Sequence, residues 1–135
     1  MVHLDQKAKR TLRLRKGVKC NMKVFLSKDL SNLPMYGDVP DLSQETNSVE
    51  SFEITDDELD LINEFFIDPT NELCDAALDL GDYQYYNDSQ CALLLDWLNK
   101  VSNEDHMIPL RNFFNKLESY LQYAVANNTG IAIEL

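Results

Sequence analysis

Five carboxylates fall within nine positions near the middle of the chain: Asp56, Asp57, Glu58, Asp60 and Glu64. Carboxylate groups bind the guanidinium and ammonium groups of arginine and lysine. Negative charge at a helix start is also favourable by about 0.3–1 kcal/mol per group, which accounts for the first three but not for Glu64. We therefore predict that Asp56, Asp57, Asp60 and Glu64 contact a basic partner, with helix stabilisation alone as the alternative.

A second acidic segment contains tyrosines. Tyr83, Tyr85 and Tyr86 stand between Asp82 and Asp88. A tyrosine ring offers rigid contact area and a hydroxyl group, and neighbouring carboxylates attract arginine or lysine. We interpret this segment as a polar loop whose five named residues contact the same partner. The alternative is that two of the tyrosines cover the hydrophobic core.

Patterns typical of enzymes and metal sites are missing from the sequence. His106 beside Glu104 and Asp105 is the best acid–base candidate, but charges in such a loop are usually solvated. The sequence contains no nucleophile elbow, phosphate-binding loop or dinucleotide fingerprint. Its acidic runs lack the alternating ligands and central glycine of a calcium loop. We expect a binding protein without cofactor or metal, and not an enzyme.

Charge is distributed unevenly along the chain. Seven of the twelve basic residues lie in the first twenty positions, whereas from Met22 onward five basic residues accompany 22 acidic ones, a net charge of −17. No lysine or arginine occurs from position 29 to position 99. Such a field repels nucleic acid and anionic membranes and attracts basic proteins. General tuning of solubility is the alternative. No segment is apolar enough to span a bilayer, and no signal peptide is recognisable, so a cytoplasmic protein is expected.

Around these residues the sequence predicts an α+β fold. The apolar run that follows Met22 and the alternating residues 131–135 predict two short strands that pair. Between them, the spacing of apolar side chains predicts about four helices. The predicted helices cover approximately residues 55–67, 69–80, 89–101 and 109–126. Thr55 and Glu58 have the spacing of a capping box at the first of them.

The charge reversal also predicts a boundary near Met22. We expect residues 1–21 to form a basic extension or arm. Residues 22–135 are expected to form a single acidic domain, with its helices packed on a small sheet that includes the C-terminal strand.

Residues 80–135 resemble small bacterial immunity proteins, which accompany the toxins of contact-dependent growth inhibition and other polymorphic toxin systems. The similarity is one of spacing, in YYNDSQCALLLDWL (85–98), Pro109-Leu110, LESYLQYA (117–124) and NTGIAIEL (128–135). It implies a cytoplasmic antidote that binds and blocks one cognate toxin domain, often a basic nuclease, and it carries over no catalytic residues. An acidic mimic of nucleic acid and a regulatory adaptor, each binding a basic protein, remain the alternatives.

Overall fold

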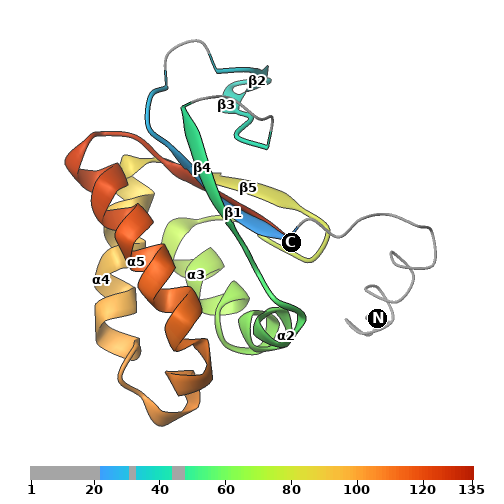
Figure 1. Cartoon of the computed structure of the whole chain (residues 1–135), viewed down its shortest axis with the longest axis vertical. Coiled ribbons are helices and arrows are strands. Elements are labelled where there is room, and N and C mark those ends of the chain that lie inside the picture. The colour runs from blue at the N-terminus through green and yellow to red at the C-terminus, as the bar shows by residue number, and fades with distance from the viewer. Residues whose placement is uncertain (1–21, 31–32, 44–47) are drawn as a thin grey trace.

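A four-stranded antiparallel sheet with helices on one face forms the body of the protein (Figure 1). The structure is a computed structural model, and it describes residues 22–30, 33–43 and 48–135. The strands are β1 (Lys23–Ser27), β2 (Met35–Tyr36), β3 (Val39–Pro40), β4 (Val49–Glu53), β5 (Tyr83–Tyr86) and β6 (Ile131–Glu134). The helices are α2 (Asp56–Phe65), α3 (Ile67–Cys74), α4 (Asp88–Val101) and α5 (Arg111–Ala126), with a 3-10 helix η1 (Asp105–Leu110) before α5. The predicted α+β class is confirmed, whereas the predicted arm of residues 1–21 lies outside the described residues.

The sheet has the strand order β4-β1-β6-β5. The two predicted strands, β1 and β6, pair at its centre with Lys23 opposite Glu134. Strands β4 and β5 extend it on either side and were not predicted as strands. The expected polar loop after Gly81 is in fact β5, which pairs with β6 over four residues. Its polar and aromatic composition concealed a strand that lies at an edge of the sheet.

Side chains of the sheet alternate between two hydrophobic clusters. Val24 and Ile133 face the helices and belong to the main core. Phe25 and Ala132 face the other side and form a smaller cluster with Leu33 and Leu42. This alternation is the two-residue period of β-strands. The connection after β1, which contains the short β2–β3 hairpin, therefore covers part of the face that the helices leave open.

Two of the helices begin with capping boxes. Thr55 N donates to Glu58 Oε1 over 3.0 Å, and Glu58 N donates to Thr55 Oγ1 over 3.1 Å, as predicted for α2. Asn87 and Gln90 make the same reciprocal bonds at the start of α4, both at 2.9 Å. Each box satisfies two backbone N–H groups that a helix start would otherwise leave unpaired. The sequence indicated the first box but not the second.

The second predicted helix is shorter than expected. Helix α3 ends at Cys74 because Asp75 adopts a left-handed conformation with φ of 52°. The side chain of Asn71 then accepts a hydrogen bond from Leu78 N (2.8 Å) and donates one to Leu78 O (2.9 Å). These bonds hold the segment after α3 out of a helix. Gly81, which directly follows the predicted helix 69–80, has φ of 86° and lies in the turn that leads into β5.

The last helix begins later than predicted and buries a slightly different stripe. Pro109 lies inside η1, and α5 starts at Arg111. The apolar spacing of this helix predicts that Val125 is buried, but Val125 is 37% exposed and Ala124 is buried in its place. Helix α5 is therefore rotated so that a small residue faces the core near its end.

The contact between α4 and α5 holds the centre of the core. Leu94 and Leu98 of α4 and Phe113, Leu117 and Leu121 of α5 are all buried in one cluster. None of these five side chains is more than 2% exposed. Their contact fixes the two longest helices against the sheet.

Replacement of Leu117 by alanine should lower the free energy of unfolding by about 2–5 kcal/mol, because it leaves a cavity in this contact. Urea titration measures the change. The control is Leu93→Ala on the outer side of α4, where the side chain is 45% exposed and the expected cost is about 0.5 kcal/mol. Equal effects of the two substitutions would mean that the α4–α5 contact is misassigned.

The smaller cluster is fastened by one hydroxyl group. Tyr83 Oη donates to Pro40 O over 2.7 Å and accepts from Leu42 N over 2.8 Å. These residues are more than forty positions apart in the chain. The bonds attach the segment after β3 to the outer face of β5, and they hold the Tyr83 ring in place.

Replacement of Tyr83 by phenylalanine keeps the ring and removes both bonds, leaving Leu42 N without its acceptor. The expected cost is about 1–3 kcal/mol of unfolding free energy, together with faster hydrogen exchange at the Leu42 amide. Tyr123→Phe on α5 is the matched control and should leave that amide unchanged. An unchanged exchange rate in Tyr83→Phe would show that the hydroxyl does not hold the segment.

Candidate partner-binding site

Two segments that the sequence marked as acidic meet at one end of the sheet. The register places Lys23 between Glu53 and Glu134, and Glu134 is also opposite Tyr83. Helix α2 follows β4 at this end, and Asp82 precedes β5 at the same end. We call this region the acidic end, defined by Glu53, Asp56, Asp57, Asp82 and Glu134. At about 4.8 Å between neighbouring strands, it spans about 14 Å from β4 to β5.

Helix α2 presents its predicted contact residues outward. Asp56, Asp57, Asp60 and Glu64 are all exposed, while Leu59 and Ile62 face the core. Glu58 is only partly exposed because its carboxylate completes the capping box. Glu58 therefore serves the helix cap, whereas the four carboxylates predicted to bind a partner are exposed, and two of them, Asp56 and Asp57, also lie in the first turn.

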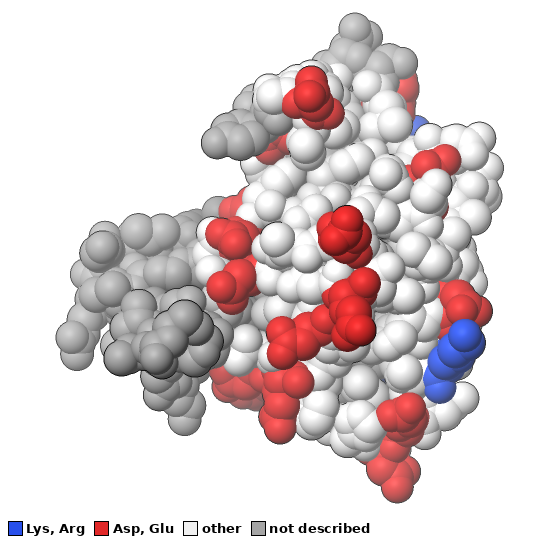
Figure 2. Space-filling view, turned by 180° about the vertical axis from the view of Figure 1, so that it is seen from behind, with Lys and Arg blue, Asp and Glu red and all other residues white. Residues whose placement is uncertain are grey.

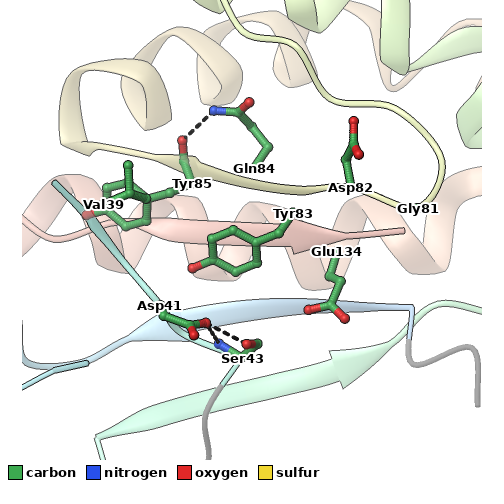
Figure 3. Close-up of a pocket in the computed structure, with 9 residues that line it drawn as sticks. All are labelled: Val39, Asp41, Ser43, Gly81, Asp82, Tyr83, Gln84, Tyr85 and Glu134. Atoms are coloured by element: carbon green, nitrogen blue, oxygen red, sulfur yellow. Dashed lines mark hydrogen bonds between the residues drawn. The ribbon is translucent and has the colours of Figure 1, made fainter. Parts of the chain in front are cut away.

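A groove of about 560 Å³ lies beside β5 at the acidic end (Figure 3). It is lined by Val39, Asp41, Ser43, Gly81, Asp82, Tyr83, Gln84, Tyr85 and Glu134. Figure 3 shows the Tyr83 ring next to the carboxylates of Asp41 and Glu134. Asp41 is held by Ser43, whose backbone N donates to Asp41 Oδ1 over 3.1 Å. The carboxylates of Asp41 and Glu134 therefore lie on the same side of the sheet as the two tyrosines, whereas the Asp82 side chain points away from them.

The Tyr83 hydroxyl stays protonated in this setting. Burial raises the pKa of Tyr83 to about 12, and the negative charges of Asp41 and Glu134 act in the same direction. The hydroxyl can therefore donate to Pro40 O across the physiological pH range. The ring beneath it is a fixed surface of the groove.

Tyr85 also lies on the groove side of β5, partly buried. Its hydroxyl passes close to Gly130, where an added Cβ would collide with Tyr85 Oη and with the carbonyl oxygen of Tyr86. Figure 3 shows Val39 against the Tyr85 ring. Burial raises the pKa of Tyr85, and the charge of Asp88 adds to the effect. Of the two rings, that of Tyr83 lies nearer the carboxylates of the groove.

Tyr86 was wrongly predicted to contact a partner. Its side chain is 0% exposed and belongs to the main core. The reason is strand periodicity: Tyr83 and Tyr85 face the groove, so Tyr86 faces the helices. Its replacement by alanine would report on core packing and not on a surface contact.

Asp88, another predicted contact residue, is partly exposed but lies at the opposite end of β5 from Asp82. It is the first residue of α4, and its Oδ1 accepts from Ser89 N over 2.9 Å. The length of β5 separates it from Asp82, and a four-residue strand rises about 3.3 Å per residue. Asp88 therefore contributes to the start of a helix, whereas Asp82 remains at the acidic end.

Two carboxylates of the groove, those of Asp41 and Glu134, were not predicted from the sequence. Glu134 lies in the predicted closing strand, but only the pairing of β6 with β5 brings it beside Tyr83. Asp41 lies in the long connection after β1, where no periodic pattern indicates a position. Alternation along 131–135 would have assigned Glu134 to the same face as Ala132, and this was the one available signal.

Negative charge dominates the rear face of the molecule. Figure 2 shows acidic groups spread over this face and basic groups only near its margin. Lys100 pairs with Asp96 over 2.9 Å within α4, and Lys28 pairs with Glu50 over 3.4 Å. Both pairs are local, and in neither does the lysine contact the groove or the exposed side of α2.

Other chemistry has little support among the described residues. His106 Nε2 lies 3.2 Å from Glu104 Oε2 at the surface, and the imidazole ring rests against Phe65. In the described part of the chain, no three His, Cys, Asp or Glu side chains gather as a metal site. No helix in the same residues has the length and apolar character needed to cross a bilayer.

Comparison of the chain with known protein families, with curated sequences and with solved structures finds no match.

Proposed function

We propose that this protein is an immunity protein, an antidote that binds and blocks one cognate bacterial toxin in the cytoplasm. The toxin domain is a basic nuclease in this proposal, and the antidote performs no chemical step. One observation carries the proposal: the exposed carboxylates of α2 and those of the groove lie at one end of the sheet. The resemblance of residues 80–135 to immunity proteins supports it from the sequence.

The size of the acidic end suits a protein partner. The groove and the start of α2 lie about 14 Å apart across the sheet. A stable protein–protein interface covers about 800 Å² of each partner, which is enough to include both features. One partner can therefore contact the protruding helix and the concave groove together.

The chemistry of the acidic end suits the active region of a nuclease. Proteins hold nucleic-acid phosphates chiefly with lysine and arginine. Lysine and arginine also bind carboxylates. Asp57, Asp60 and Glu64 can therefore occupy the positions that phosphates take when the nuclease binds its substrate. An opposite field also accelerates encounter, by about 10- to 1,000-fold in steered complexes.

The alternative is a mimic of nucleic acid or a regulatory adaptor, in which the exposed row on α2 contacts a basic protein that is not a toxin. The groove favours the antidote, because a mimic needs rows of carboxylates and makes no use of aromatic side chains in a concavity. The nature of the partner distinguishes the two.

To test the function, the full chain is used as bait in its source cell, and each captured protein is expressed alone and together with the chain. The expected partner is a basic nuclease that stops growth when expressed alone. Its activity should fall to background at one equivalent of this protein. A non-toxic nucleic-acid-binding partner would support the mimic, and turnover of a substrate by the purified protein alone would contradict both.

Once the partner is identified, replacement of Asp57, Asp60 and Glu64 by lysine should lower mainly the association rate. We expect an association rate about tenfold lower or more at low salt, with a smaller change in dissociation, because steering acts on encounter. Stopped-flow fluorescence measures both rates. The control reverses Asp96, Glu104 and Asp105, which changes the net charge equally at other positions. If both triple variants slowed association equally, the net charge of the protein would control the association rate, and the position of the carboxylates on α2 would not.

A further inference from the structure

We propose that the outer edge of β4 pairs with β4 of a second copy of this chain, so that two sheets continue into one across a twofold axis. This inference goes beyond the proposed function and does not rest on it, because the groove lies beside β5 at the other edge of the sheet. The occupant of the edge is the strand Val49–Glu53 of the second copy.

The backbone of β4 has one open side. Just before the strand, Lys28 N donates to Ser48 O over 2.7 Å, and just after it Ile54 N donates to Met22 O over 2.8 Å. Bonds between antiparallel strands alternate along each strand. Every second residue of β4, beginning with Val49, therefore directs its N–H and C=O groups away from β1. The strand order ends at β4, and within the described residues no strand pairs with this side.

One register of self-pairing uses every outward residue of the strand. With the twofold axis at Ser51, the outward groups of Val49 in one copy face those of Glu53 in the other, and Ser51 faces its own counterpart. Each of these pairs exchanges two backbone hydrogen bonds. The remaining residues, Glu50 and Phe52, then stand opposite each other, so no like charges meet directly across the axis.

The side chains in this register are complementary in charge. Phe52 lies on the helix side of the sheet, opposite Val24 of the main core, and Glu50 lies on the same side two residues earlier. Lys116 of α5 stands over the Phe52 ring, with its Nζ 5.6 Å from the ring centre. Glu50 of one copy is opposite Phe52 of the other and therefore lies beside its Lys116. The twofold axis makes this contact twice.

Lysines offset the charges that would otherwise keep this edge unpaired. Proteins often protect an edge strand from pairing with charged side chains. Here Lys28 Nζ lies 3.4 Å from Glu50 Oε2. Lys23 stands opposite Glu53 in the register of β1 with β4. Together with Lys116, three of the five lysines and arginines among the described residues thus lie beside β4.

Antiparallel pairing also keeps the two acidic ends apart. The Glu53 residues of the two copies are separated by four positions, about 13 Å, along the paired strands. The Debye length at physiological ionic strength is about 8 Å. Salt therefore screens most of the repulsion between the two acidic ends, and the grooves beside β5 lie at the outer edges of the joined sheet.

Partly exposed rings supply apolar area beside the strand. The Phe52 and Tyr120 rings lie 5.1 Å apart on the helix side, and both side chains are only partly buried. Aromatic side chains contribute large areas to interfaces. A stable interface covers about 800 Å² of each partner, so α5 takes part with Tyr120 and Lys116 beside β4.

The test measures the molar mass of the full chain by sedimentation velocity at physiological salt, at protein concentrations up to about 1 mM. The mass should rise from 15.6 kDa toward twice that value as the concentration increases. Over the same range, hydrogen exchange at the Ser51 amide should slow about tenfold or more, because the pairing takes up its N–H group.

Matched variants at position 51 locate the edge. Ser51→Pro removes the central outward N–H group of β4 and no bond to β1, and proline is tolerated on edge strands. This variant should stay monomeric over the whole concentration range. Ser51→Ala keeps the N–H group and should dimerise like the parent chain. Thermal melts confirm that both variants are folded.

A charge exchange tests the register. Lys116→Glu and Glu50→Lys should each weaken the dimer, because two like charges then meet on both sides of the axis. An equal mixture should form a heterodimer, in which each substituted residue meets the opposite charge. Its Kd should be at least about tenfold lower than that of either variant alone. The control variants Lys100→Glu and Asp96→Lys on α4 change the net charge equally and should show no preference for the mixture.

Three results would overturn the proposal. The first is a chain that stays monomeric up to about 1 mM, with rapid exchange at the Ser51 amide. The second is a monomer in which this amide exchanges slowly, because another segment of the same chain would then cover the edge. The third is a dimer that Ser51→Pro and the charge exchange leave unchanged, because its interface would then lie elsewhere on the molecule.

Discussion

The antiparallel pairing of β1 with β6 determines where the other parts of the protein lie. These strands are almost the whole described chain apart in sequence, yet they are neighbours at the centre of the sheet. Because side chains alternate along each strand, the register sends Val24 and Ile133 to the helices and Lys23 and Glu134 to the opposite face. A shift of one residue would exchange the two faces and bury charge in the core. The acidic end exists because this register is strongly specified by the apolar residues on the helix side.

The helices supply the stability that an acidic surface needs. Like charges on a compact molecule repel one another and oppose folding. Here the repulsion is confined to exposed positions, whereas Leu94, Leu98, Phe113 and Leu117 exclude water from the contact between α4 and α5. Charged residues and packing residues therefore form two separate sets on opposite sides of the same elements, as on α2, where Asp60 is exposed and Leu59 is buried. Substitutions in the two sets should have effects that are nearly additive.

Most of the fold could be predicted from periodicity, and the site only in part. The four helices and the two central strands carry strong apolar patterns. The edge strands β4 and β5 carry no such pattern. One face of each is partly in contact with solvent, and polar or aromatic residues occur on both faces. This explains how Tyr86 was taken for a surface residue: without a strand assignment, nothing in the sequence separates it from Tyr85.

The groove could not be predicted from the sequence because long-range pairing brings its residues together. The exposed side of α2 follows from local rules, since a capping box and helical spacing determine which carboxylates point outward. The groove does not, because Asp41, Asp82 and Glu134 come from three separate segments. Only the sheet order and the bonds of one hydroxyl bring them together.

The two hydrogen bonds of Tyr83 also divide the groove into positions with different freedom to change over evolution. Position 83 must keep a phenol, because the same side chain fastens the segment that carries Asp41 and forms the floor of the groove. The side chain of Asp82, by contrast, is exposed in the turn before β5. Substitutions at the rim of the groove can therefore change the preferred partner while the fold around Tyr83 stays unchanged. Changes at the border of the groove then alter its specificity while the two bonds of Tyr83 still fasten the segment that carries Asp41.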